Sequence, residues 1–395
     1  MATVRIRPGH VRPLWAGHPW VYAQAIATVE GSPAAGDVVD VIDPQGKWLG
    51  AGFYSPKSAF AVRILSRTQG EAIDATFFEA RLRAARGLRR DWLGLPNEQT
   101  TGYRLVHAEG DGLSGLVVDV YDDVASVQLL TAGMKRREAE VFAALAKVAE
   151  VRTIIEVPSR DHQEIEGFSV EPRVVHGPSV DALKFRELGF DYELPLSSMQ
   201  KTGFYFDQRD NRARLQQLCR GRRVLDAFCY MGSFSLAAAR GGAREVLALD
   251  RSEGALTAGA QVAARAGLSE RIRFERADVK KTLPELIVAN QRFDVIVLDP
   301  PKLASSTKHL ERARKAYRHW NAQALRLVQP GGLLVSCSCS AAMQPLDFVR
   351  TLALSAADAG REVSLLELGE QAPDHPTPAA FDEGRYLKAA FLRVL

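Results

Sequence analysis

Four carboxylates each follow the carboxyl end of a predicted strand in the second half of the chain. They are Asp226, Asp250, Asp278 and Asp299. In an open α/β sheet this edge is where ligands bind. A single strand-end acid is commonly just a helix N-cap, but four in series favour a ligand site.

The spacing of these acids favours an adenosyl ligand. Asp250 lies 18 residues beyond Gly232, the spacing at which a carboxylate on a second strand accepts hydrogen bonds from ribose hydroxyls. Asp278 could contact the amino group of an adenine, and Asp226 could meet a cationic amine. A pyrophosphate would need several glycines, whereas the loop after Asp226 has one.

Two cysteines lie near the same edge. Cys337 and Cys339 are two residues apart, so they share a face of an extended strand. Cys339 is further along, toward the carboxyl edge that Asp299 also occupies. We expect Cys337, Cys219 and Cys229 to be packing residues. Four clustered cysteines predict no disulfide framework, and no spacing predicts a metal site.

The elements that must position these groups alternate from Arg223 onward. Strands are predicted at 223–226, 245–250, 271–275, 293–298, 332–337 and 386–394, with helices between them. This alternation predicts a parallel, doubly wound sheet with right-handed crossovers.

The part of the chain before Arg223 has a different pattern of predicted elements. Residues 37–43, 48–54 and 59–65 are strand-like, which favours a small β-barrel. A middle segment begins with a helix capped by Asp74, followed by a hairpin, a helix over 135–149 and further strands at 152–157 and 183–194. It shows no catalytic constellation.

Composition fits a globular protein of several domains. The 395 residues carry a net charge of +4, divided as +3 over 1–70, −7 over 71–200 and +8 over 201–395. We therefore expect domains at 1–70, 71–195 and 196–395. No apolar run of ~18 residues and no secretory leader is visible, so no membrane association is expected and the cytoplasm is the expected location.

Several motifs resemble one family of enzymes. The loop after Asp226, Asp250 and Asp299-Pro-Pro-Lys302 are similar to motifs I, II and IV of class I S-adenosylmethionine-dependent methyltransferases. The segments 202–211, Ser338-Cys-Ser340, 372–376 and 383–388 resemble the ribosomal RNA large subunit methyltransferase I family. Segments 7–14, 18–21 and 50–56 look like the PUA domain of that family. Met231 and Ser233 depart from the usual Thr and Gly.

The resemblance implies an α/β chain with three parts. These are an N-terminal PUA-like RNA-binding β-barrel, a small α+β middle domain and a C-terminal Rossmann-like methyltransferase domain with a seven-stranded sheet. It implies S-adenosyl-L-methionine as cofactor. The residues expected to bind it are Phe206, Asp207, Gln208, Arg209, Asp226, Phe228, Tyr230, Gly232, Ser233, Phe234, Asp250, Arg251, Ser252, Asp278, Asp299 and Pro300.

The family's reaction is methylation of carbon 5 of a cytosine in 23S rRNA. Because that carbon is a poor nucleophile, a thiolate must first add to carbon 6. Cys339 aligns with the family's cysteine and is the expected nucleophile. Asp299, protonated through burial, would hydrogen-bond the cytosine edge. Lys302 would contact the base or a phosphate, or be an ordinary solvated lysine.

A basic run beside the catalytic loop favours RNA as substrate. It consists of Lys302, Lys308, Arg312, Arg314, Lys315 and Arg318, interleaved with Tyr317 and Trp320 for base stacking. The resemblance implies 23S rRNA or a large-subunit assembly intermediate as the partner, and a homodimer is left open.

Two alternatives stay open. In a purine-nitrogen (guanine) RNA methyltransferase of related architecture, Cys339 would be a bystander. A non-catalytic RNA-binding ribosome assembly factor would keep the fold without the reaction. Cofactor binding and a cysteine–RNA adduct discriminate among the three hypotheses.

Overall fold

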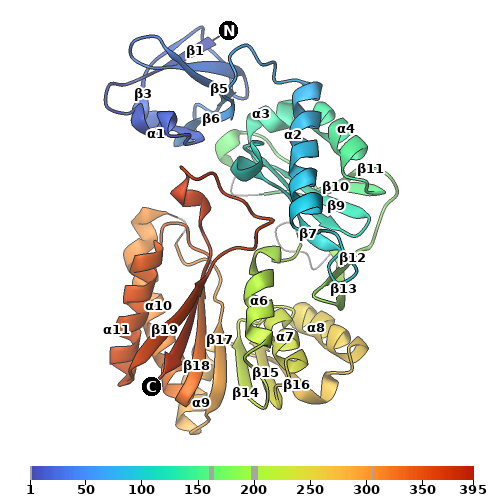
Figure 1. Cartoon of the computed structure of the whole chain (residues 1–395), viewed down its shortest axis with the longest axis vertical. Helices are drawn as coiled ribbons and strands as arrows, with labels where there is room; N and C mark the ends of the chain where they lie inside the picture. Colours follow the sequence, from blue (N-terminus) through green and yellow to red (C-terminus); the bar gives the residue numbers. More distant parts are fainter. Residues whose placement is uncertain (1, 160–163, 197–202, 305) are drawn as a thin grey trace. The chain divides into compact units, whose positions relative to one another are not determined.

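The computed structural model describes residues 2–159, 164–196, 203–304 and 306–395. The chain forms two compact units, shown in Figure 1. Unit 1 comprises residues 1–189, 194–206 and 373–384, and unit 2 comprises 190–193, 207–372 and 385–395. The domain boundaries at residues 70 and 195 stay a prediction. Thr202, the first residue of the 202–211 motif, lies outside the described residues.

Unit 1 begins with a six-stranded sheet in the order β2-β6-β5-β4-β1-β3. Only β1 and β4 pair in parallel. Alternating apolar residues such as Val4, Ile6, Val39 and Val41 form its core. The strands predicted at 37–43, 48–54 and 59–65 are confirmed. The bounds are β1 Ala2–Ile6, β2 Trp20–Tyr22, β3 Ile26–Glu30, β4 Val38–Ile42, β5 Trp48–Tyr54 and β6 Phe60–Ser66, with the short helix α1 at Arg12–Trp15.

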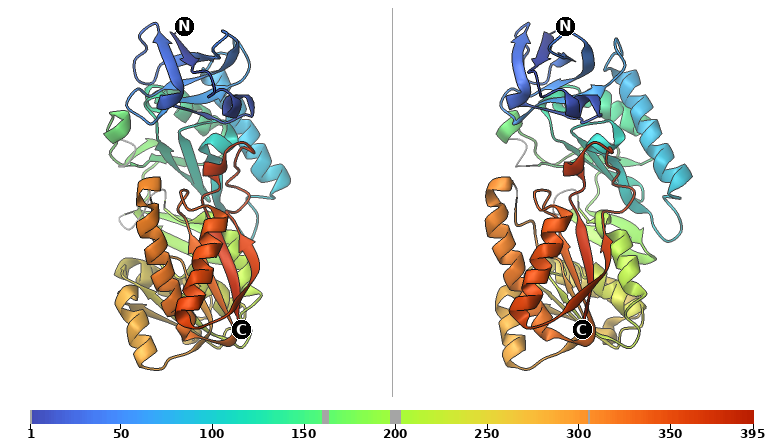
Figure 2. Two further views of the ribbon diagram at one scale, coloured as in Figure 1. Left: turned by 90° about the vertical axis from the view of Figure 1, so that its left-hand side faces the viewer. Right: turned by 60° about the vertical axis from the view of Figure 1, so that its left-hand side comes forward.

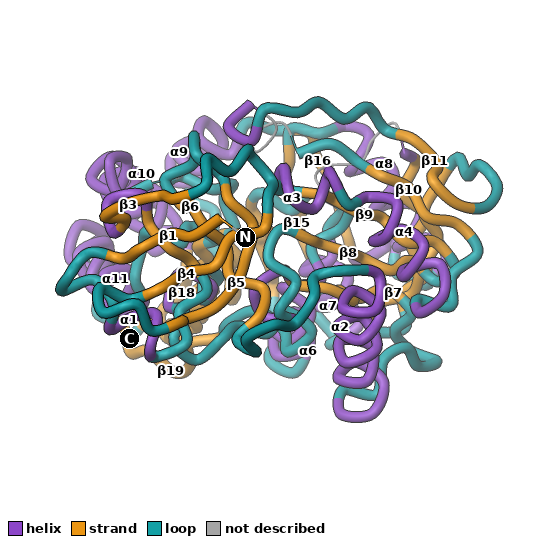
Figure 3. Tube along the Cα trace, turned by 90° about the horizontal axis from the view of Figure 1, so that it is seen from above, coloured by secondary structure: helices purple, strands orange, loops and turns teal. Residues whose placement is uncertain are grey.

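The second sheet of unit 1 has five strands in the order β11-β10-β9-β8-β7 (Figure 3). Its bounds are β7 Gly102–His107, β8 Leu116–Tyr121, β9 Val124–Leu129, β10 Thr153–Glu156 and β11 Arg173–His176. The β8–β9 hairpin is confirmed. The chain then continues through β12 (Ala182–Glu187) and β13 (Phe190–Pro195). Residues 190–193 of β13 belong to unit 2, the chain returns to unit 1 at residue 194, and it enters unit 2 again at Asp207.

The helices beside this sheet partly match the prediction. Helix α2 (Ala75–Gly87) begins as expected, because the Asp74 carboxylate accepts hydrogen bonds from the backbone of Thr76 and Phe77. The single helix predicted over 135–149 is wrong. Thr131 caps an earlier start, and Arg137, with φ −107° and ψ 19°, separates α3 (Ala132–Arg136) from α4 (Glu138–Val148).

The hydrophobic core of the second sheet includes side chains of the first segment. Ala51, Phe53 and Leu65 pack with residues such as Phe78 and Val118. A Cβ at Gly133 would lie 2.1 Å from Cγ of Phe53, so α3 approaches that ring as closely as glycine allows. The first 70 residues therefore do not bury their apolar surface on their own.

Unit 2 contains a seven-stranded sheet in the order β16-β15-β14-β17-β18-β20-β19. All pairs are parallel except those of β20, which runs antiparallel to β18 and β19. The predicted strands are confirmed, but β19 was not predicted individually. The bounds are β14 Arg223–Ala227, β15 Glu245–Asp250, β16 Ile272–Arg276, β17 Phe293–Leu298, β18 Val328–Ser338, β19 Val363–Gly369 and β20 Lys388–Val394.

Helices cover both faces of this sheet (Figures 1 and 2). Helices α10 and α11 pack side by side, as do α6 and α7. The bounds are α6 Arg209–Gln216, α7 Ser233–Arg240, α8 Glu253–Arg265, α9 Val279–Val288, α10 Leu310–Leu327 and α11 Pro345–Ala359. No helix in the described ranges is long and apolar enough to cross a membrane.

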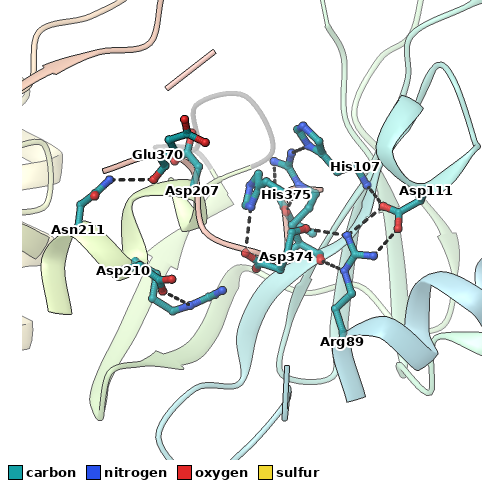
Figure 4. Close-up of polar contacts among 12 residues, drawn as sticks. Arg89, His107, Asp111, Asp207, Asp210, Asn211, Glu370, Asp374 and His375 are labelled. Atoms are coloured by element: carbon teal, nitrogen blue, oxygen red, sulfur yellow. Dashed lines mark hydrogen bonds and ion pairs between the residues drawn. The ribbon is translucent and has the colours of Figure 1, made fainter. Parts of the chain in front are cut away.

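Residues 373–384 interrupt unit 2 and belong to unit 1. Two hydrogen bonds within unit 2 flank this segment. The Ala372 N–H donates to the Asp207 carbonyl at 2.8 Å, and the Tyr386 hydroxyl donates to the Asp207 carboxylate at 2.7 Å. Inside unit 1 the buried Asp374 accepts a hydrogen bond from the Arg104 backbone, and its carbonyl accepts one from Arg89 (Figure 4).

Candidate active site

The loop between β14 and α7 adopts an unusual backbone conformation. Phe228, Tyr230 and Gly232 have φ values of 65°, 52° and 67°. Non-glycine residues in this region cost on the order of 1 kcal/mol or more each and tend to occur at functional sites. A Cβ on Gly232 would lie 2.5 Å from Cε1 of Phe274, so this position requires glycine. The loop is held as a tight turn against β16.

Asp226 is the last residue but one of β14, and its carboxylate is buried. Its Oδ2 accepts hydrogen bonds from the Ser235 backbone at 3.0 Å and hydroxyl at 2.7 Å. Its Oδ1 is buried and has no hydrogen-bond partner among the described residues. Burial raises the pKa of Asp226 to about 6, and the nearby Asp250 charge adds to the rise. A cationic group would satisfy this oxygen.

Asp250 ends β15 and is half-buried. Its Oδ2 accepts the backbone N–H of Tyr230 at 2.8 Å, and its Oδ1 accepts that of Ser252 at 2.9 Å. Ser252 in turn caps α8. The carboxylate therefore ties the β14–α7 loop to the start of α8 and retains lone pairs for a further donor.

Asp278 serves as the N-cap of α9. Its carboxylate accepts a hydrogen bond from the Lys280 backbone and pairs with Arg251. The Arg251 guanidinium lowers the pKa of Asp278 below its usual range. The ordinary capping role thus applies to this acid. A contact between Asp278 and an adenine stays a prediction.

Asp299 follows β17, which lies between β14 and β18 at the centre of the sheet. The Gln208 side-chain amide donates to its Oδ2 at 3.1 Å. Burial, together with the charges of Asp207 and Asp226, raises the pKa of Asp299 to about 7. The raised pKa favours the protonated carboxyl near neutral pH, and its hydrogen bond to a cytosine stays a prediction. Pro300, which follows it, is buried.

The two cysteines of the fifth strand have different environments. Cys337 lies inside β18 with no exposed surface, and burial raises the pKa of its thiol well above the ordinary value. Cys339 follows the last residue of β18 and is partly exposed. The electrostatic neighbours of Cys337 include both Asp299 and Cys339. Cys339 is therefore the thiol of this pair that a substrate can reach.

Ser340 joins several elements beside Cys339. Its hydroxyl accepts the Ala304 backbone N–H at 3.1 Å and lies 3.4 Å from the Tyr317 hydroxyl. Its carbonyl accepts the Lys388 ammonium at 2.7 Å. Ser340 and Lys388 lie within the motifs Ser338-Cys-Ser340 and 383–388 but are not among the predicted site residues. A lysine within the apolar strand 386–394 was the available signal.

The residues before α6 divide between the two units. The ring of Phe206 packs in unit 1 against Tyr121 and Phe204, with centroids 5.2 Å away in both cases. Gln208 lies in unit 2, where Asn211 donates to its side-chain oxygen at 2.7 Å. This bond orients the Gln208 amide toward Asp299. Asp207 and the buried Arg209 also belong to unit 2.

The first turn of α7 completes the loop. Ser233 and Phe234 are buried, and the Arg212 guanidinium lies 5.7 Å from the Phe234 ring centroid. Phe228 packs against Trp320 with ring centroids 5.5 Å apart. These contacts give the aromatic side chains of the loop fixed places in unit 2.

The basic run from Lys302 to Arg318 is only partly as expected. Tyr317 and Trp320 are buried in the core of unit 2, so the expectation that they stack on RNA bases is wrong. They lie on the apolar face of α10, which packs on the sheet. The basic residues Arg314, Lys315 and Arg318 pair with Asp347, Glu311 and Asp358. Lys302, Lys308 and Arg312 are exposed and have no ion-pair partner in the described part of the chain.

The site as a whole suits a cationic ligand. Asp226, Asp250 and Asp299 lie at the carboxyl ends of three adjacent strands. Burial and neighbouring carboxylates raise the pKa values of Asp226 and Asp299. A ligand with an ammonium or sulfonium charge would relieve this repulsion, whereas a phosphate would add to it. The residues present therefore fit S-adenosylmethionine.

Two family models match the chain. A PUA-like domain model matches residues 4–67, and a model described as S-adenosylmethionine-dependent methyltransferase matches residues 104–393, which is more than half of the chain. The cofactor of this chain is accordingly S-adenosylmethionine.

Curated relatives match over the full length. The ribosomal RNA large subunit methyltransferase I of Shewanella denitrificans is 40% identical over 396 residues and covers 99% of each chain. The protein of the same name from Erwinia tasmaniensis is 37% identical over 397 residues, with 100% of each chain covered.

Solved structures share the fold. A structure from Streptococcus mutans described as a SAM-dependent methyltransferase has a TM-score of 0.86 at 19% identity and covers 100% of both chains. A methyltransferase described as complexed with SAH has a TM-score of 0.86 at 20% identity, again with 100% of both chains covered. At this identity the likeness shows the fold.

Proposed function

The chain belongs to the ribosomal RNA large subunit methyltransferase I family, and on that premise we propose that it methylates carbon 5 of a cytidine in 23S rRNA with S-adenosylmethionine as donor. The observation that carries the cytosine chemistry is the position of Cys339. This partly exposed thiol follows β18 at the same sheet edge as Asp299, which follows the neighbouring strand β17. A purine-nitrogen methyltransferase would need no thiol there.

The cofactor residues have separable tasks. Asp226 would accept the ammonium with its unpartnered Oδ1, and Asp250 would accept ribose hydroxyls. Asp278 would contact the adenine, while the β14–α7 loop would enclose the methionine portion. When bound, S-adenosylmethionine supplies an electrophilic methyl group on a sulfonium.

The proposed reaction begins at the Cys339 thiolate. The Cys339 thiolate adds to carbon 6 of cytosine, forming a C–S bond and making carbon 5 nucleophilic. Carbon 5 then takes the methyl group while the bond between that methyl and the sulfonium sulfur breaks, which leaves S-adenosylhomocysteine. A base then removes the carbon 5 proton. The electron pair then re-forms the 5,6 double bond and expels the thiolate. Asp299 in its protonated form would donate to cytosine N3 during addition.

The basic surface beside this site supports an RNA substrate. Lys302, Lys308 and Arg312 are exposed on the segment that follows Asp299. Unpaired cations are free to neutralise phosphates, which is the main source of affinity for nucleic acids. The paired residues Arg314, Lys315 and Arg318 would have to exchange a carboxylate for a phosphate. We therefore propose the first three as the principal RNA contacts of this segment.

The test uses 23S rRNA fragments carrying 5-fluorocytidine. Fluorine at carbon 5 blocks the last proton removal, so wild-type enzyme with S-adenosylmethionine should form an adduct that survives denaturing electrophoresis. Cys337→Ser should still be trapped, since Cys337 is enclosed in β18. Cys339→Ala should not be.

Other outcomes assign the reaction differently. Trapping of the Cys339→Ala variant but not of the Cys337→Ser variant would reverse the assignment of the nucleophile. Full methylation by the Cys339→Ala variant would instead favour the purine-nitrogen reaction. Absence of S-adenosylmethionine binding in calorimetry would favour a non-catalytic assembly factor.

A further inference from the structure

Lys388 is a buried ammonium in an apolar strand. It begins β20, and 1% of its surface is exposed. The strand residues that follow it, Ala389, Ala390 and Phe391, are buried and apolar. Lysine is almost never fully buried unless its charge is compensated. A functional or structural reason for the charge is therefore required.

Two carbonyl groups account for two of the three N–H donors of Lys388. Nζ donates to the Ser340 carbonyl at 2.7 Å and to the Tyr386 carbonyl at 2.8 Å. In the antiparallel pairing of β18 with β20, Lys388 lies opposite Ser338. The ammonium is thus held beside Cys339 by its bond to Ser340, while its own strand pairs with Ser338.

The electrostatic environment links this ammonium to the thiol of Cys339. Burial lowers the pKa of Lys388 to about 8, and the charges of Cys339 and Glu370 oppose that shift. The lysine therefore remains mainly cationic at neutral pH. A cation close to a cysteine favours the thiolate, which is the nucleophilic form.

The other charged and titratable groups around the turn are mainly acidic. Asp299 follows β17, Asp226 lies within β14 and Glu370 follows β19. Tyr317 and Cys337 come from α10 and β18. Among the described residues, Arg212 of α6 is a further cation, and it acts on Asp226 and Asp299. The Lys388 ammonium would offset the repulsion of a Cys339 thiolate by the acidic groups.

We propose that Lys388 is a positioning residue for the methylation reaction: its ammonium stabilises the Cys339 thiolate and holds the Ser338–Ser340 turn in place. This inference rests on the proposed role of Cys339 as nucleophile. Neither the proposed cofactor contacts nor the proposed RNA contacts involve this buried charge. A purely structural lysine would hold the turn without affecting the acidity of the thiol.

The test measures how readily Cys339 is alkylated by iodoacetamide as a function of pH, with mass spectrometry of the Cys339 peptide as readout. Lys388→Met should lower the rate about ten-fold at pH 7, because less of the thiol is then present as thiolate. Lys388→Gln keeps an N–H donor for the turn but carries no charge, and it should show the same loss.

Tyr317→Phe is the matched control. It removes the hydroxyl that lies 3.4 Å from the Ser340 hydroxyl without changing any charge at neutral pH. Its alkylation profile should follow that of the wild type. Wild-type profiles for both Lys388 variants would overturn the proposal, as would a normal profile for Lys388→Gln with a loss only for Lys388→Met.

A reciprocal measurement needs no change at Lys388. Removal of the thiol in Cys339→Ala should lower the pKa of the Lys388 ammonium, followed by NMR of its labelled Nζ, because the coupling of two charges is mutual. An unchanged Lys388 titration would contradict the proposal. Trapping on 5-fluorocytidine tests the nucleophile separately. A normal adduct of the wild type, together with wild-type alkylation profiles in the Lys388 variants, would overturn the role of Lys388 but not that of Cys339.

Discussion

The Gln208 side-chain amide donates a hydrogen bond to Oδ2 of Asp299 over 3.1 Å. Asn211 fixes the orientation of that amide by donating to its oxygen at 2.7 Å. The bond connects the segment before α6 with the end of β17, and it favours the ionised form of Asp299. Burial and the charges of Asp207 and Asp226 nevertheless outweigh it, so the pKa of Asp299 is about 7.

Replacement of Asp299 should remove a pH dependence of stability. A carboxyl whose pKa is raised in the folded state stabilises the fold at low pH, and this contribution is lost as pH rises through about 7. From pH 5 to pH 8 the free energy of unfolding of the wild type should fall by up to about 3 kcal/mol relative to that of Asp299→Asn. Urea denaturation of both proteins at the two pH values measures the difference.

Asp278→Asn is the control for this experiment. The pKa of Asp278 is lowered by Arg251, so the carboxyl is ionised in folded and unfolded chains alike between pH 5 and pH 8. Its difference from the wild type should be constant over this range. A constant difference for Asp299→Asn as well would contradict a raised pKa.

Asp250→Asn should weaken S-adenosylmethionine binding. The two carboxylate oxygens accept the backbone N–H groups of Tyr230 and Ser252, and an amide can accept only one of them while presenting a donor to the other. Loss of a charge-assisted bond costs ~1.5–3 kcal/mol, or roughly ten- to hundred-fold in Kd. Calorimetry gives the affinity directly.

Glu245→Gln provides the comparison for that variant. Glu245 begins the same strand β15 at its opposite end and pairs with Arg223 at the surface. Its affinity for the cofactor should equal that of the wild type. Unchanged affinity of Asp250→Asn would exclude Asp250 from the cofactor site.

Trp15→Ala should reduce affinity for rRNA. Trp15 ends α1 with 63% of its surface exposed, and Arg12 of the same helix is also exposed. Stacking of a base on an aromatic ring contributes ~1–3 kcal/mol. Fluorescence anisotropy at fixed salt should show a loss of roughly five-fold or more, which corresponds to the lower end of that range, while cofactor affinity stays the same.

A second exposed tryptophan serves as control for Trp15. Trp92 of unit 1 is 84% exposed but lies outside the PUA-like segment. Trp92→Ala should leave RNA affinity unchanged. Equal losses in the two variants would indicate nonspecific aromatic contacts. Point variants are preferable to deletion of residues 1–70, because Phe53 packs into the core of the second sheet.

Arg89→Met should strongly destabilise unit 1. The Arg89 side chain is fully buried, pairs with Asp111 and donates to the carbonyls of Arg104 and Asp374 (Figure 4). Removal of one partner of a buried ion pair costs about 3–5 kcal/mol because the other charge is left uncompensated. Thermal and urea denaturation measure the loss.

Two further variants separate charge from packing at this position. Adding Asp111→Leu to Arg89→Met should restore part of the stability, since no unpaired charge then remains. Arg83→Met breaks an exposed pair with Glu79 and should cost less than about 1 kcal/mol. A small effect of Arg89→Met would show that the buried pair is not needed for stability.

The sequence by itself determined those features that depend on local order. The alternation of strands and helices after Arg223, the Asp74 cap and the acids at strand ends follow from residue spacing and from short-range hydrogen bonding. The motif resemblance extended these features to the PUA-like and methyltransferase domains, which the family matches confirm. The strand β19 was not predicted, because its two adjacent leucines break the alternation of apolar and polar residues. Leu365 and Leu366 are both substantially exposed.

Only the tertiary structure decided which distant residues meet. Lys388 contacts Ser340 across 48 residues, Tyr317 turns inward on α10, and residues 373–384 join unit 1 although they lie between two strands of unit 2. No local pattern encodes these contacts, because they depend on strand order and on which helix face packs against the sheet. The charge beside Cys339 is therefore a property of the fold, while the cysteine itself is visible in the sequence.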